Sequence, residues 1–121
     1  MRVPTACFFI LLAASPALAQ GYPVSGRYGV VTSPSDGPVD CGNKRVIEFS
    51  GGQRSDSQGG VPGYRMKSVT ANGSGQWRVT DQFTTGQIRN GSMSYTLKQP
   101  DADHLELNQS KGGTIKLQKC K

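Results

Sequence analysis

The chain has 121 residues with a formal net charge of +6, and it contains 16 glycines, 7 prolines and 1 histidine. A chain of this length makes one domain with a modest core, and a single histidine with scattered carboxylates excludes an ordinary zinc site. The many turn-forming residues, together with the lack of an apolar repeat of period 3.6 after the N-terminal segment, favour β-structure and exclude a helical fold.

The N-terminal segment 1–19 is predicted to be a cleaved signal peptide. It has one positive charge at Arg2, an apolar run over residues 6–14 and a small-x-small end at Ala17–Ala19. The apolar run is about half the length that spans a bilayer, which disfavours a retained anchor. We therefore expect residues 20–121 to form a single soluble all-β domain, located in a periplasm or secreted.

The cysteines bear on both compartment and architecture. Cys7 lies in the segment that is predicted to be removed, which leaves Cys41 and Cys120. Thiols pair in an oxidising compartment, and two cysteines allow only one intramolecular disulfide. We expect the disulfide Cys41–Cys120, with two unpaired thiols or an intermolecular bond as the alternatives. The lack of a Cys-x-x-Cys motif favours a structural role over a redox role.

Alternating apolar and polar residues predict a series of short strands in chain order. The expected strands are 26–32, 45–50, 63–71, 76–83, a short one around Ile88, a longer one with Met93, Tyr95 and Leu97 inward, 104–108 and 114–120. The segment 51–62 is so polar and rich in glycine that a long mobile loop is expected there.

Tight turns join these strands. Asn72-Gly73 and Asn90-Gly91 have the residues that accept the positive φ of hairpin turns. Seven or eight strands joined by sequential hairpins predict an antiparallel meander that closes into a small barrel or splits into a sandwich. In a closed meander the last strand pairs near the first, and the disulfide Cys41–Cys120 fastens it there.

Few residues are suited to catalysis. His104, beside a turn, is predicted to be a solvated surface residue, since the chain has no Gly-x-Ser-x-Gly motif. Glu48 and Asp81 are candidates for a carboxylate pair, but Asp81, on an inward phase, is expected to bond backbone amides. Asp101 and Asp103 lack the remaining ligands of a calcium loop. The sequence therefore predicts a protein that is not an enzyme, without cofactor or metal.

Two sets of residues are candidates for binding. Basic residues with an outward phase predict an anion-binding wall formed by Arg65, Lys67, Arg78 and Arg89. Inward apolar and aromatic residues are predicted to line the barrel: Tyr64, Met66, Trp77, Val79, Phe83, Met93 and Tyr95. A solvated basic face and a filled core are the respective alternatives. Nucleic acid is disfavoured as a partner, because the aromatic residues point inward rather than between the charges.

Several segments carry a resemblance to a known class of proteins. The Ala-Leu-Ala end of the signal segment, "GRYGVV" at 26–31, "GQWRV" at 75–79 and the closing "LELNQSKGGTIKLQKC" are similar to small periplasmic bacterial proteins with a lipocalin-like β-barrel domain. In lipocalins the Gly-x-Trp motif opens the first strand, whereas Gly75-Gln76-Trp77 lies in the middle of this chain. The resemblance implies a small closed barrel, an architecture that several bacterial inhibitors of lysozyme or proteases share.

Three functions follow as hypotheses. The first is a non-enzymatic envelope or secreted binding module for an anionic or small apolar ligand, with an anionic envelope component as one candidate partner. The second is an inhibitor of a lysozyme or protease, which presents the segment 51–62 to its target hydrolase. The third is a structural or stress-linked envelope protein without a ligand.

Overall fold

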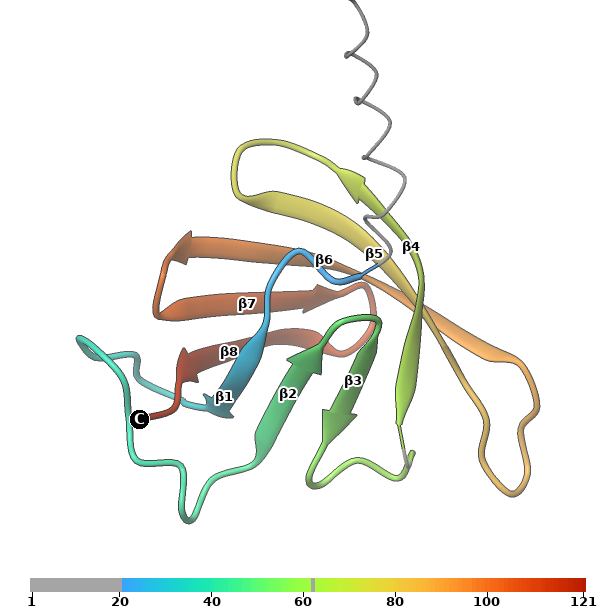
Figure 1. The fold of residues 1–121 in the computed structure, drawn as a ribbon, viewed down its shortest axis with the longest axis horizontal. Helices are drawn as coiled ribbons and strands as arrows, with labels where there is room; N and C mark the ends of the chain where they lie inside the picture. The colour runs from blue at the N-terminus through green and yellow to red at the C-terminus, as the bar shows by residue number, and fades with distance from the viewer. Residues whose placement is uncertain (1–20, 62) are drawn as a thin grey trace, which may run out of the picture.

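Eight antiparallel strands pair in chain order, and the last returns to the first to close a barrel (Figure 1). The computed structural model describes residues 21–61 and 63–121, so the predictions for segment 1–19, residue 20 and Pro62 lie outside the described part. The strands are β1 (Gly26–Val30), β2 (Val46–Ser50), β3 (Gln53–Asp56), β4 (Tyr64–Ala71), β5 (Gln76–Phe83), β6 (Gly91–Asp101), β7 (His104–Gln109) and β8 (Gly113–Lys119).

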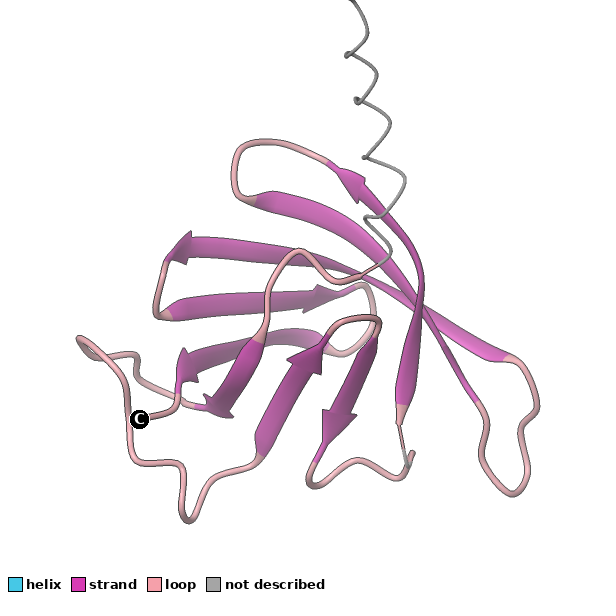
Figure 2. Cartoon of the chain, in the orientation of Figure 1, coloured by secondary structure: helices cyan, strands magenta, loops and turns pink. Residues whose placement is uncertain are grey.

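The described residues contain strands, turns and loops but no helix, and so no helix that could cross a membrane (Figure 2). The predicted all-β meander is confirmed. Of the two forms that the sequence allowed, the structure is the closed barrel and not the sandwich.

The closure of the barrel depends on β1. Its Gly29 lies opposite Gln118 of β8, and on its other side β1 pairs with β2. Directly after β8 comes Cys120, whose N–H donates to the carbonyl of Arg27 in β1. Cys120 forms a disulfide with Cys41, with 5.6 Å between their Cα atoms. The predicted disulfide is confirmed, and it fastens the closing strand to the start of the barrel.

Inward side chains of β1, β2 and β5 to β8 supply most of the hydrophobic core. The buried hydrophobic residues are Tyr22, Val24, Tyr28, Ile47, Phe49, Val79, Tyr95, Leu97, Leu105, Leu107 and Leu117. Two of these belong to the segment that precedes β1. In that segment the ring of Tyr22 packs edge-on against Phe49 with 5.1 Å between ring centroids. The segment before β1 is therefore part of the packed structure.

The prediction of a long mobile loop over 51–62 is wrong, because this segment contains β3. Arg54, at the centre of β3, is only 4% exposed. Its guanidinium pairs with the carboxylate of Asp81, which lies 27 residues further along the chain. Alternating apolar residues do not predict this strand, because its inward residue, Arg54, is charged. Its partner Asp81 is distant in sequence.

The predicted short strand around Ile88 is also wrong. Ile88 lies in the loop between β5 and β6 and is 47% exposed. The Thr85 hydroxyl accepts hydrogen bonds from the N–H groups of Gln87 and Ile88, so a local turn replaces strand pairing. Asn90 has a φ of 56°, but Gly91 begins β6, so a longer loop takes the place of the predicted tight hairpin turn at Asn90-Gly91.

Candidate functional site: an open hollow over a buried ion pair

An ion pair lies inside the barrel wall between β3 and β5. The Nε atom of Arg54 donates to Oδ2 of Asp81 at 2.9 Å, and the two side chains are 3% and 0% exposed. Two tyrosine hydroxyls also donate to this carboxylate, Tyr22 to Oδ1 at 2.7 Å and Tyr95 to Oδ2 at 2.9 Å. The carboxylate thus has three donors, which is how a buried charge becomes tolerable.

The guanidinium of Arg54 is held by aromatic rings as well as by Asp81. It lies 3.8 Å from the ring centroid of Tyr64, and Nη2 contacts the sulfur of Met93 at 3.7 Å. The face of an aromatic ring attracts a cation electrostatically, so the Tyr64 ring stabilises the Arg54 guanidinium. The cluster therefore connects β3, β4, β5 and β6.

The titration of these groups follows from their burial. Burial raises the pKa of Tyr22 and of Tyr95, and the neighbouring Asp81 raises both further, so both remain neutral donors. Burial by itself would lower the pKa of Arg54, whereas the charge of Asp81 and its hydrogen bond raise this pKa, and the net direction is upward. Arg54 is therefore a permanent buried cation.

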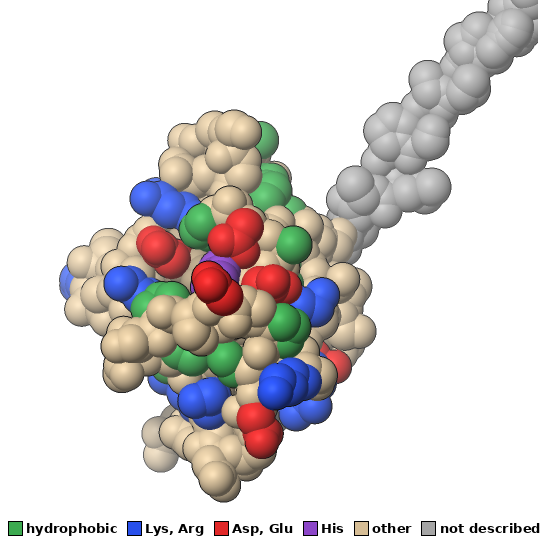
Figure 3. Space-filling model, turned by 90° about the vertical axis from the view of Figure 1, so that its left-hand side faces the viewer, with side chains coloured by type: hydrophobic (Ala, Val, Ile, Leu, Met, Phe, Trp, Pro, Cys, Tyr) green, Lys and Arg blue, Asp and Glu red, His purple; other side chains and the backbone are tan. Residues whose placement is uncertain are grey.

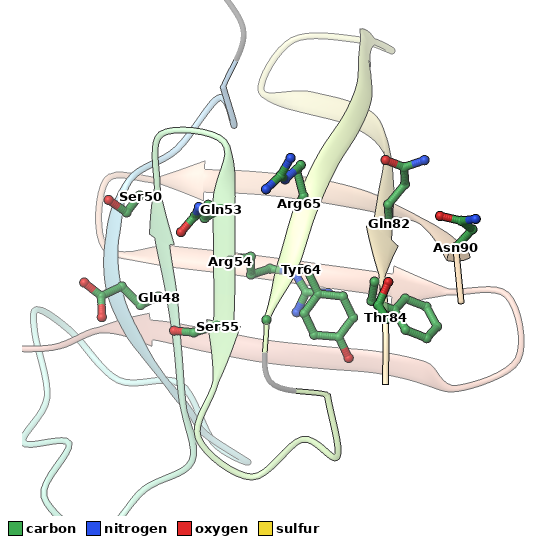
Figure 4. Close-up of a pocket in the computed structure, with 12 residues that line it drawn as sticks. Glu48, Ser50, Gln53, Arg54, Ser55, Tyr64, Arg65, Gln82, Thr84 and Asn90 are labelled. Carbon is green, nitrogen blue, oxygen red and sulfur yellow. The ribbon is translucent and has the colours of Figure 1, made fainter. Parts of the chain in front are cut away.

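An open hollow of 710 Å³ lies over this ion pair, on the outside of the wall formed by β2 to β5 (Figure 4). Its lining residues are Glu48, Ser50, Gln53, Arg54, Ser55, Gly63, Tyr64, Arg65, Gln82, Phe83, Thr84 and Asn90. The only register pairs between β3 and β4 in the described residues are Gln53–Arg65 and Arg54–Tyr64. The hollow lies where this short pairing ends, because Ser55 and Gly63, the next residues of the two segments, also line it.

A row of polar side chains crosses the hollow. Ser50, Gln53, Arg65 and Gln82 lie in register on four consecutive strands. Adjacent strands are about 4.8 Å apart, so the row spans roughly 14 Å. We call these four residues the polar row. Together they offer a hydroxyl, two amides and a guanidinium to one ligand.

An aromatic surface lies beside the polar row. The half-buried ring of Tyr64 meets that of Phe83 with 5.6 Å between centroids. Figure 4 shows the Tyr64 ring overlying the Arg54 guanidinium. The hollow thus combines hydrogen-bonding groups, an exposed cation at Arg65 and an apolar ring, a combination suited to binding.

The candidate carboxylate pair is not brought together. Glu48 is exposed on the outer surface of β2, whereas Asp81 is fully buried inside the barrel. The expectation that Asp81 bonds backbone amides is wrong, because its oxygens accept from the side chains of Arg54, Tyr22 and Tyr95. No short-range pattern in the sequence indicates these partners.

His104 lies in a second cluster, at the turn between β6 and β7. Its Nδ1 is 2.7 Å from Oδ1 of Asp101, and its Nε2 is 2.7 Å from the carbonyl of Ser35. The side chain is 20% exposed and hydrogen-bonded at both nitrogens, unlike the solvated residue expected. The hydrogen bond with Asp101 raises the pKa of His104, and the same bond lowers the pKa of Asp101.

This second cluster holds a loop in place. Figure 3 shows the histidine among acidic side chains, but the described residues contain no group of three or more His, Cys, Asp or Glu arranged to hold a metal. The buried side chain of Gln118 accepts from the N–H of Ser35 at 3.0 Å, beside the contact from His104. These contacts tie the β1–β2 connection to the barrel.

The four basic residues of the predicted wall are all exposed, and they lie on β4, on β5 and in the β5–β6 loop. Arg65 lies in the hollow, whereas Arg78 lies opposite Thr70, further along β4. Lys67 lies at a β-bulge, and Arg89 lies in the β5–β6 loop. Of these four residues, Arg65 alone lines the hollow.

The seven residues predicted to line the barrel fall into two groups, one in the core and one at the hollow. Those in the core or packed against it are Val79, Tyr95, Met66, Trp77 and Met93. The other two, Tyr64 and Phe83, lie at the hollow. Arg54 and the polar amides beside it were not predicted as site residues, and the one available signal in the sequence is an isolated arginine within a glycine-rich run.

Comparisons with known proteins add no relative to this description. No protein-family model, no curated protein and no solved structure matches the chain. The resemblance to lipocalin-like proteins therefore stays a prediction, and the geometry of the hollow carries the functional argument.

Proposed function

We propose that the protein is a non-enzymatic binding module that holds an anionic saccharide in the hollow. The observation that supports this most directly is the polar row, in which Arg65 stands between Gln53 and Gln82 on neighbouring strands. A guanidinium pairs well with a carboxylate or sulfate, and side-chain amides bond hydroxyl groups. The ring of Tyr64 offers an apolar surface to the carbon skeleton of a sugar.

The alternatives receive less support. A small apolar ligand would need an apolar cavity, and the hollow is instead lined mostly by polar side chains. An inhibitor that presents the segment 51–62 as a loop would have to move Arg54, which is buried in its ion pair. A purely structural role leaves the polar row unexplained.

We also propose that the protein acts outside the cytoplasm, in a periplasm or after secretion. The disulfide Cys41–Cys120 supports this, because such bonds persist in oxidising compartments. The predicted signal peptide is consistent with the same location.

The test is a titration with galacturonate oligomers followed by calorimetry. The matched probe is the same oligomer with methyl-esterified carboxylates, which keeps the sugar and removes the charge. We expect only the charged form to bind, with affinity that falls as salt is added. Arg65→Gln should weaken binding about tenfold, because a charge-assisted hydrogen bond is lost.

Arg78→Gln is the control, since it removes an exposed arginine of the same sheet that lies outside the hollow. It should leave the affinity nearly unchanged. Equal losses in the two variants would indicate diffuse attraction to a basic surface, and equal binding of the esterified oligomer would reject an anionic ligand.

A further inference from the structure

β4 leaves much of one edge unpaired in the described part of the chain. Its first residues pair with β3, and the N–H of Met66 donates to the carbonyl of Gly52 in the β2–β3 turn. Beyond Met66, the segment Lys67–Ala71 pairs only with β5 among the residues that the structure describes. Figure 1 shows β4 running past the β2–β3 turn, with β5 along its other side. We call Lys67–Ala71 the open edge.

The backbone groups that point away from β5 follow from the ladder. Asn72 donates its N–H to the carbonyl of Gln76 at 2.8 Å, which identifies a hydrogen-bonded position. Such positions alternate along an antiparallel pair, so the N–H and C=O groups of Val69 and Ala71 face the open edge. They are spaced by about 7 Å, the repeat of a partner strand.

We propose that the open edge accepts an acidic, extended segment of another protein as an additional antiparallel strand. Strand addition uses backbone hydrogen bonds for affinity and side chains for selectivity. Arg65, Lys67 and Arg78 are exposed on β4 and β5. No Asp or Glu occurs in the sequence between Asp56 and Asp81, so the field here attracts an acidic partner.

A second copy of this chain is the disfavoured occupant. Each copy carries a formal charge of +6, and lysine on an edge is a common device against self-pairing. Lys67 also lies at the β-bulge between Met66 and Ser68, which disturbs a regular match with an identical strand. The same positive charges attract an acidic strand. The open edge can therefore disfavour pairing with a second copy and favour an acidic partner.

The decisive variant is Ala71→Pro, with Ala71→Ser as its matched control. Proline removes the N–H that faces the open edge and leaves the hydrogen bonds to β5 intact. Ala71 is exposed, so neither change removes a core contact. The probe is a capped peptide of alternating Glu and Val, and the same peptide with Lys in place of Glu is its control.

We expect the Glu peptide to bind and to slow amide hydrogen exchange at Val69 and Ala71. Ala71→Pro should weaken binding about tenfold or more through the lost hydrogen bond and the ring in its place, whereas Ala71→Ser should bind normally. Lys67→Glu gives an independent check, because it should weaken the Glu peptide and favour the Lys peptide.

Three results would overturn the proposal: equal binding of the Lys peptide, unchanged exchange at Val69 and Ala71, or a dimer that Ala71→Pro dissociates. The last result would assign the open edge to a second copy. Binding of galacturonate at the hollow should be unaffected by Ala71→Pro, so a failure here is distinguishable from a failure of the proposed function.

Discussion

At the scale of single residues, the most consequential feature is the carboxylate of Asp81 inside a barrel of about a hundred residues. Desolvating an ion costs several kcal/mol, and the cost is offset only when good geometry and further hydrogen bonds are present. Arg54, Tyr22 and Tyr95 supply both. The ion pair therefore makes the stability of the barrel depend on the presence of both charges.

Asp81→Asn should strongly destabilise the protein. The change leaves the Arg54 guanidinium buried without its counter-ion, which costs about 3–5 kcal/mol of unfolding free energy. Urea unfolding followed by circular dichroism measures this loss. Asp36→Asn, at an exposed carboxylate, is the control and should leave the transition nearly unchanged. A similar small shift in both variants would show that the buried pair contributes little.

At the scale of elements, β3 shows how a strand forms without apolar residues. Its four residues pair with β2 across their whole length. Its inward residues are Arg54, bound to Asp81, and Asp56, whose Oδ2 lies 2.6 Å from Nη2 of Arg45. Charged contacts on one face thus take the place that a hydrophobic pair fills in other strands.

Deleting Arg54-Ser55 should abolish cooperative unfolding, whereas deleting Gly59-Gly60 should be tolerated. Each deletion removes two residues and preserves the alternation of the chain. The first also removes the cation that balances Asp81, and the second shortens an exposed turn. Thermal unfolding compares them directly. Equal transition temperatures would mean that β3 is dispensable and that the segment behaves as the loop expected from the sequence.

At the scale of the whole molecule, the disulfide Cys41–Cys120 stabilises the closed barrel, in which β8 pairs with β1. β8 meets β1 over three register pairs, and Cys120 directly follows β8. The disulfide joins residues 79 positions apart, so it restricts most of the unfolded chain. A cross-link of this span acts mainly by lowering the entropy of the unfolded state.

The double variant Cys41→Ser, Cys120→Ser should lose up to about 4.5 kcal/mol of unfolding free energy, because the loop it frees has about 80 residues. Denaturant unfolding of the variant measures the loss. Reduced wild-type protein is the control, and it should match the variant. An unchanged midpoint after reduction would show that closure by hydrogen bonds alone is sufficient.

The prediction of the fold succeeded where the signals are local. Alternating residues predicted β5 with its observed bounds, and most other strands differ at their ends by only one or two residues. The hairpin turn predicted at Asn72-Gly73 is confirmed between β4 and β5, with a positive φ at Gly73. The predictions failed at 51–62 and at Ile88, where a charged contact and a local turn decided the structure.

The sequence alone predicted the β class and the disulfide Cys41–Cys120, and it left a closed barrel and a sandwich as alternatives. These depend on alternation, turn residues and cysteine count, which are properties of neighbouring residues or of composition. Only the tertiary structure decided that Arg54 and Asp81 meet, that the polar row lies in register and that β4 keeps an open edge. Each of these requires strands distant in sequence to lie side by side, because burial of a charge is favourable only once its partners are in place.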